Sequence, residues 1–307
     1  MCKPRRDDRR GTGKDPSVRA AFAAIPTTQR GIILFLMAMF FFAAMDVVAK
    51  SLMARHEPFM VVWARYASQT FWTLLILSPR LRRLFRTRHL GLQLLRSAFL
   101  FSATFCFFTA IKFMKLAEAV AIFEVAPLMI TILSVVVLKE LVGMRRWFGV
   151  LIGLLGALII IRPGTDVFSV YSLFPIGAAF CFAAYSISTR FLSSDEPPVT
   201  SFLYTTLIGT VVASVLVPNF WSMPDTRDLA VMATFGVLGG IGHFILIVAF
   251  TIAPASVLAP YSYFGLVLSA FWGYFIFNEV PDFWTWVGAL VIVGAGLYVW
   301  HRENTTR

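Results

Sequence analysis

The sequence has few charged residues and few cysteines. Only 14% of its 307 residues are Asp, Glu, Lys or Arg, about half of what soluble domains carry. So few charges cannot cover the apolar surface that a hydrophobic content of 58% would produce, which excludes a soluble globular protein. The three cysteines, Cys2, Cys106 and Cys181, have no spacing typical of a disulfide framework or a metal site. We therefore expect an integral membrane protein without disulfides, metals or other cofactors.

Acidic residues are scarcer than basic ones, 16 against 27, which gives a net charge of +11. In a soluble chain this imbalance would suggest nucleic acid as a partner, but the apolar excess excludes that interpretation here. Residues 1–30 are polar, hold eight of the basic residues and lack the apolar stretch of a signal peptide. We expect them to form a disordered basic tail in the cytoplasm.

The apolar residues gather in runs of about 20, the length that a helix needs to cross a lipid bilayer. Proline-containing breaks such as Glu57-Pro58, Pro197-Pro198 and Pro281-Asp282 separate the runs. The pattern predicts an all-α membrane protein with ten transmembrane helices. Their expected ranges are 31–52, 58–77, 91–113, 117–138, 145–162, 170–190, 199–217, 229–252, 255–277 and 283–300.

The distribution of basic residues predicts the orientation of these helices. If the N-terminal tail is cytoplasmic, twenty Lys and Arg residues fall on the cytoplasmic side, including six from Arg80 to Arg96, and only six fall outside. Such a bias is typical of the positive-inside rule. We expect both termini to face the cytoplasm and the chain to lie in a bacterial inner membrane.

The two halves of the sequence resemble each other. A shift of 140 residues places 40–44 (FFFAA) on 180–184 (FCFAA) and Lys50 on Arg190, and a shift of 139 places Glu140 on Glu279. We therefore expect a five-helix repeat at 31–162, a second repeat at 170–300 and a cytoplasmic tail at 301–307. Because five is odd, the second repeat enters the membrane from the opposite side. Inverted repeats are typical of secondary transporters, whose substrate site lies between the halves near the bilayer midplane.

Several motifs occur in a recognisable order from Gly31 to Trp300. They are Arg65-Tyr66, Pro127, Lys139-Glu140 and Asn278-Glu279, the last continuing into Val280-Pro281-Asp282. With these motifs the chain resembles the EamA-like ten-helix members of the drug/metabolite transporter superfamily, and especially its S-adenosylmethionine and riboflavin uptake carriers. The resemblance implies a central cavity and alternating access driven by gradients rather than ATP. Gly265-Leu266 replaces the proline that would match Pro127, so we expect a straighter ninth helix.

Among the ionisable residues inside predicted spans, three stand out. Asp46, Arg65 and Glu124 each lie about 10 Å from the outer end of their span, at 1.5 Å per residue, so they share one depth. One interpretation is a structural ion pair between Asp46 and Arg65. In the other, Arg65 or Glu124 contacts the substrate and Glu124 binds a coupling proton. His243 is either a packing residue or a second proton or substrate ligand.

Aromatic residues in the second repeat extend the candidate substrate site. Tyr261 and Tyr263 correspond to the stretch around Glu124, and Tyr185 precedes the counterpart of Asp46. Trp63, two residues before Arg65, is a further candidate. Such a site would suit a planar or cationic metabolite. For Glu140 and Glu279 we expect helix capping and loop bracing.

These features predict a secondary transporter rather than an enzyme. It would move a small organic metabolite by alternating access, in the uptake direction by its resemblance and coupled to a gradient or to protons. The alternatives are an exporter of the same fold, a channel or a membrane-embedded enzyme. The long loop near 78–90 lacks carboxylates, which disfavours the enzyme. Apart from the bilayer we expect no macromolecular partner beyond a second copy in a weak homodimer, with a monomer as the alternative.

Overall fold

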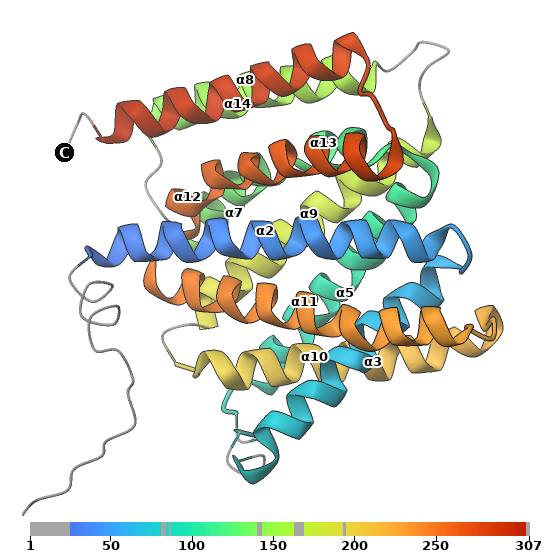
Figure 1. Ribbon diagram of the computed structural model, residues 1–307. Coiled ribbons are helices and arrows are strands. Elements are labelled where there is room, and N and C mark those ends of the chain that lie inside the picture. Colours follow the sequence, from blue (N-terminus) through green and yellow to red (C-terminus); the bar gives the residue numbers. More distant parts are fainter. Residues whose placement is uncertain are drawn as a thin grey trace, which may run out of the picture.

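The computed structural model describes residues 25–80, 84–85, 87–139, 143–162, 169–192 and 195–304. Every regular element in these ranges is a helix (Figure 1). The α-helices are α2 (Thr27–Met53), α3 (Pro58–Leu77), α5 (Leu90–Phe113), α6 (Leu116–Phe123), α7 (Ala126–Leu138), α8 (Met144–Ile161), α9 (Leu173–Leu192), α10 (Pro198–Leu216), α11 (Thr226–Ile252), α12 (Ala255–Leu258), α13 (Tyr263–Phe277) and α14 (Phe283–Asn304). Short 3-10 helices are η1 (Ser78–Arg80), η2 (Val170–Ser172), η3 (Val217–Phe220) and η4 (Ala259–Ser262).

Each predicted span coincides with a helical segment to within a few residues. Six segments of the described chain are long and apolar enough to cross a membrane: Thr27–Met53, Leu90–Phe113, Leu116–Leu138, Val170–Leu192, Pro198–Phe220 and Thr226–Ile252. Large apolar side chains such as Ile76 and Val215, each 72% exposed, cover the helix surfaces, as lipid contact requires. The prediction of an all-α membrane protein is confirmed. The count of ten crossings and the inverted relation of the halves stay predictions.

The helices lie side by side in a bundle with α2 near its middle (Figure 1). α2 packs against α11 and α13, α5 packs against α9 and α10, and α3 packs against α10 and α11. The pair α8 and α14 lies along one edge of the bundle. Contacts therefore run mainly between segments from different halves of the sequence.

Glycine allows α8 and α14 to touch at the level of their backbones. A Cβ atom on Gly288 would lie 2.5 Å from the carbonyl oxygen of Gly156 and 2.4 Å from Cγ1 of Ile160. No side chain fits into that space. The two helices therefore pack as closely as small residues permit in membrane proteins.

Corresponding residues end α7 and α13. Lys139 and Asn278 both adopt the left-handed conformation, each with φ of 55°. Only a few residue types other than glycine tolerate this conformation, and Asn is one of them. Asn278 turns the chain so that Glu279 points back into the bundle, whereas Glu140 lies outside the described residues.

Candidate functional site

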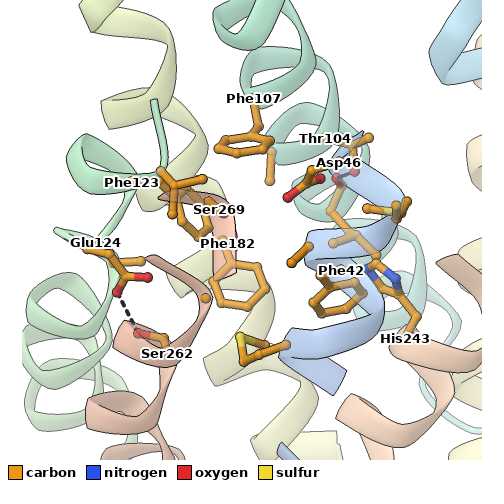
Figure 2. Close-up of a pocket in the computed structure, with 18 of the residues that line it drawn as sticks. Phe42, Asp46, Thr104, Phe107, Phe123, Glu124, Phe182, His243, Ser262 and Ser269 are labelled. Atoms are coloured by element: carbon orange, nitrogen blue, oxygen red, sulfur yellow. Dashed lines mark hydrogen bonds between the residues drawn. The ribbon is translucent and has the colours of Figure 1, made fainter. Parts of the chain in front are cut away.

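A cavity of about 120 Å³ lies at the centre of the bundle, and α2, α3, α5, α6, α7, α9, α11, η4 and α13 contribute to its wall. Most of the wall is apolar. Phe42, Phe107, Phe123 and Phe182 surround the space, and Figure 2 shows their rings between two polar sides. Glu124 and Ser262 form one polar side, and Asp46, Thr104 and His243 lie on the other. Arg65 also belongs to that second side, since it contacts Thr104 and His243.

Glu124 lies at a break in the fourth apolar segment. α6 ends at Phe123 and α7 begins at Ala126, because Pro127 at the start of α7 has no backbone N–H to continue the first helix. The Glu124 carboxylate is buried and accepts a hydrogen bond from the Ser262 hydroxyl at 2.6 Å. In Figure 2 its other oxygen is turned toward the cavity.

The ninth segment is also broken, so the expectation of a straighter helix is wrong. α12 passes through η4 into α13, and Ser262 is the last residue of η4. Pro260 explains the interruption although no proline stands at the position that matches Pro127. Two discontinuous segments thus meet at the Glu124–Ser262 contact. In transporters, irregular backbone at membrane depth is characteristic of substrate sites.

Arg65 is buried and contacts the side chains of Thr104 and His243. Its Nη1 donates to Thr104 Oγ1 at 2.5 Å, and its Nη2 lies 3.2 Å from Nε2 of His243. His243 Nδ1 lies 3.0 Å from the Gly239 carbonyl oxygen, to which it donates. The same Nη2 of Arg65 lies 3.1 Å from Nδ1 of His243, so both ring nitrogens are within hydrogen-bond distance of the guanidinium. Nε of Arg65 is buried without a partner in the described structure.

Asp46 does not pair with Arg65, so the expectation of a structural ion pair is wrong. Among the described residues, Asp46 forms no ion pair and accepts no hydrogen bond, although its carboxylate lies on the cavity wall. Arg65 makes its hydrogen bonds with Thr104 and His243 instead. A common depth brings two residues to one level of the membrane, but their rotation about the helix axes decides whether they meet.

The four aromatic candidates do not line the cavity. Tyr185 is fully buried beside it, where its hydroxyl contacts Arg96 Nη2 at 3.3 Å. Trp63 faces another part of the bundle and donates to Ser214 at 3.1 Å. Tyr261 and Tyr263 are partly buried and pack against the two halves of the core. Since adjacent residues diverge by about 100° on a helix, the inward position of Ser262 turns both neighbouring tyrosines away.

Arg96, counted from the sequence among the basic residues of the cytoplasmic side, lies inside α5 and is fully buried. Its guanidinium donates to Thr189 at 2.7 Å, to Thr205 at 2.8 Å and to the Ser201 carbonyl oxygen at 3.0 Å. It lies 4.9 Å from the ring centre of Tyr185. Arg96 thus connects α5, α9 and α10 without contributing to the cavity wall.

Sequence reasoning identified Asp46, Arg65, Glu124 and His243 because ionisable residues in apolar spans are rare. It missed the phenylalanine lining, since nothing in one sequence separates Phe107 or Phe182 from the other members of a set of 31. It also missed Thr104 and Ser262, the hydroxyl partners of the buried charges. No group of three or more His, Cys, Asp or Glu side chains in the described ranges could hold a metal ion.

Known proteins of similar sequence are transporters. An S-adenosylmethionine uptake transporter of Rickettsia bellii is 30% identical over 285 residues, which are 92% of this chain and 97% of the relative. A riboflavin transporter of Vibrio cholerae is 31% identical over 74% of this chain and 78% of the relative. A pseudopaline exporter of Pseudomonas aeruginosa is 29% identical over 86% of this chain and 94% of the relative.

A solved crystal structure shares the fold, with a TM-score of 0.72 at 18% identity, covering 91% of this chain and 99% of the solved one. The model of the EamA-like transporter family matches twice, over residues 29–162 and 170–300. These matches span both halves of the bundle and every segment that lines the cavity. The chain is a multi-pass membrane protein and belongs to the EamA-like transporter family.

Proposed function

We propose that the protein is a secondary carrier that moves a small organic metabolite by alternating access of the central cavity. One observation carries the proposal: Asp46, Arg65 and Glu124 are all buried at the cavity, and none forms an ion pair within the described structure. Burying ionisable groups without direct ion-pair partners is costly inside a membrane. Their retention is accounted for if a solute supplies the missing partners.

The size of the cavity supports a change of conformation during transport. Its volume of about 120 Å³ is well below the roughly 300 Å³ at which pockets for drug-sized ligands begin. A metabolite with a ring system would therefore bind only after the walls move apart. The two matches of the family model, one in each half, support movement between units 31–162 and 170–300.

The walls favour a planar or cationic solute. The rings of Phe42, Phe107, Phe123 and Phe182 offer faces for stacking and for cation–π contact. The two carboxylates on opposite sides, Asp46 and Glu124, outnumber the single guanidinium of Arg65. We expect Asp46→Asn to weaken the binding of cationic S-adenosylmethionine about tenfold, the equivalent of 1.4 kcal/mol, and to change the binding of riboflavin little. Equal losses for both solutes would contradict a charge-selective role for Asp46.

For direction and coupling we propose uptake, with Glu124 as the carrier of a coupling proton and both termini in the cytoplasm. The buried Glu124 carboxylate, with one hydroxyl partner and one oxygen toward the cavity, is suited to exchange a proton for a cation. Export is the second candidate, and the similarity to the pseudopaline exporter favours it.

Counterflow in proteoliposomes tests the carrier proposal. Vesicles containing the purified protein are loaded with unlabelled S-adenosylmethionine or riboflavin and diluted into the labelled compound. We expect a transient, saturable accumulation of label that a channel cannot produce. Simple equilibration of label, together with ion conductance, would indicate a channel. Uptake by intact cells with an imposed pH gradient then separates import from export.

A further inference from the structure

A cluster of polar contacts joins three segments at the end of the bundle where α2 and α13 terminate. Lys50 Nζ lies 2.6 Å from Oε1 of Glu279 and donates to the Met114 carbonyl oxygen at 2.8 Å. Oε2 of Glu279 accepts from the backbone N–H of Leu116 at 2.8 Å. Lys115 Nζ donates to the Val280 carbonyl oxygen at 3.0 Å. The cluster therefore ties the last turn of α2 to the start of α6 and to the residues after α13.

The local sequence explains why these groups meet. Asn278 adopts the left-handed conformation that ends α13 and brings Glu279 over the first turn of α6. A carboxylate is favourable at the N-terminus of a helix, and a lysine is favourable in the last turn of α2. Nζ of Lys50 also lies 5.5 Å from the ring centre of Phe277, the last residue of α13. The Lys50 and Glu279 side chains are only 13% and 20% exposed, so solvent screens this pair less than a surface pair.

The three segments that meet here are segments that line the cavity. Asp46 lies one helical turn before Lys50 on α2, about 6 Å along the axis. Glu124 directly follows α6, whose eight residues span about 12 Å from Leu116. Ser269 lies on the wall and belongs to α13. For the cavity to open at this end, α2 must separate from α13, and the contacts of Lys50 must break.

The sequence repeat places a corresponding cation at the opposite end of the bundle. Arg190, the counterpart of Lys50, lies in the last turn of α9, and Figure 1 shows α9 ending at the other side from α2. Its Nη1 donates to the carbonyl oxygen of Phe250 at 3.1 Å near the end of α11, as Lys50 donates to Met114 at the end of α5. The two ends of the bundle thus carry corresponding contacts between a basic side chain and a backbone carbonyl.

We propose that the Lys50–Glu279 contact is the latch that closes the cavity at the end where α2 terminates. The proposal rests on alternating access as the proposed function. Lys50 holds α2 against Glu279 while the cavity is closed at this end, and its release lets α2 and α13 part.

The test measures access to the cavity without any substrate. Ala103→Cys places a thiol on the cavity wall of the full-length chain, with Cys2, Cys106 and Cys181 replaced by serine. Ala54→Cys, in a separate variant, marks the side of the membrane on which this end lies, because Ala54 is exposed just after α2. A membrane-impermeant maleimide is then applied from that side. We expect Lys50→Ala to raise the labelling rate of the cavity thiol about tenfold, Glu279→Gln to raise it less, and Lys50→Arg to leave it low.

A second ion pair at the same end serves as the matched control. Lys112 Nζ lies 2.8 Å from Oε2 of Glu57, but this pair does not join α2 to α13. Lys112→Ala is therefore expected to leave labelling unchanged. The latch is refuted if Lys50→Ala labels no faster than Lys112→Ala, or if Lys50→Arg labels as fast as Lys50→Ala. Faster labelling of Lys50→Ala from both sides of the membrane would mark unfolding of that variant. The test then depends on Glu279→Gln: faster labelling from the α2 end alone supports the latch, and an unchanged rate refutes it. The labelling experiment involves no solute. If counterflow fails while the Lys50 variants label as expected, only the proposed carrier function is contradicted.

Discussion

Glu124 and Ser262 stand 138 positions apart in the sequence, and the serine hydroxyl donates to the glutamate carboxylate at 2.6 Å. Each belongs to an interrupted membrane segment, one broken before Pro127 and the other at Pro260. A side-chain hydrogen bond therefore connects the two irregular points of the fold across one corner of the cavity. Any solute or proton that changes Glu124 acts directly on the contact between the two halves.

Glu124→Gln should abolish uptake driven by a pH gradient but preserve counterflow exchange. Glutamine keeps the size of the side chain and can still accept from Ser262, but it cannot bind and release a proton. Transport by the wild type and by Glu124→Gln is measured in proteoliposomes with and without an imposed pH gradient. Ser262→Ala, which removes the hydrogen bond and keeps the carboxyl group, serves as the control and should retain pH-driven uptake. Unchanged pH dependence in Glu124→Gln would remove this residue from proton coupling.

Arg65→Lys should raise the KM for solute about tenfold and lower the melting temperature only slightly. A lysine cannot reach Thr104 and His243 together, and it lacks the Nε group that now has no partner. The matched variant is Arg96→Lys, since Arg96 is equally buried but away from the cavity wall. There the loss of hydrogen bonds should lower stability by about 2 kcal/mol without changing KM. If Arg65→Lys instead loses stability at constant KM, Arg65 is a structural brace.

Asp282→Asn should reduce stability at neutral pH but not at low pH. Oδ1 of Asp282 accepts from the backbone N–H of Thr285 at 2.8 Å, and Oδ2 accepts from Arg162 at 2.5 Å. Burial works against ionisation here, but the hydrogen bonds from Thr285 and the charge of Arg162 prevail and hold the pKa of Asp282 below its usual value of 3.8.

Because this pKa is lowered by folding, the carboxylate contributes stability at every pH above its ordinary value, and the contribution disappears as the pH falls through the lowered one. Melting temperatures of the wild type and Asp282→Asn should therefore differ at about pH 7, begin to converge below about pH 4 and meet once the pH lies below the lowered pKa. Asp225→Asn, which alters the cap of α11, is the matched control. A difference that persists in acid would show that the charge of Asp282 is not its source.

Gly288→Ala should destabilise the α8–α14 pair. The added methyl group would meet the Gly156 carbonyl oxygen and the Ile160 side chain at distances below van der Waals contact, and overpacking of this kind costs about 1–3 kcal/mol. Gly294→Ala in the same helix meets nothing within 4 Å and should leave stability unchanged or slightly raised. Thermal unfolding in detergent compares the two variants. Equal melting temperatures would mean that α8 and α14 move apart freely.

The helical segments could be predicted from the sequence because their apolar length is set by the bilayer and their ends by proline. That Asp46, Arg65, Glu124 and His243 line the cavity could be predicted too, since ionisable residues inside a span face a cavity or a partner. The rotation of each helix about its axis, which decides the side chains that face the cavity, could not be predicted. Tyr263 corresponds to Glu124 by the repeat, yet η4 changes the helical phase and Ser262 faces the cavity instead.

It was equally difficult to predict which basic residues lie in a loop and which lie inside the bundle. Arg96 follows a strongly basic loop and counts by sequence with the cytoplasmic side, but α5 carries its guanidinium into the bundle, where it is fully buried. Neutral partners such as Thr189 and Thr205 make this burial possible, and they come from α9 and α10, about a hundred positions further along. No local pattern records such distant hydrogen bonds.

The three unpaired charges of the cavity also determine how membrane voltage acts on the protein. If Asp46 and Glu124 are both ionised in the empty protein, its cavity carries one net negative charge, because Arg65 stays cationic. A bound monocation would then cancel that charge, and the loaded protein would reorient without moving net charge through the field. The return of the empty protein is then the step that the electrical potential accelerates or slows, by up to about 2.3 kcal/mol per 100 mV.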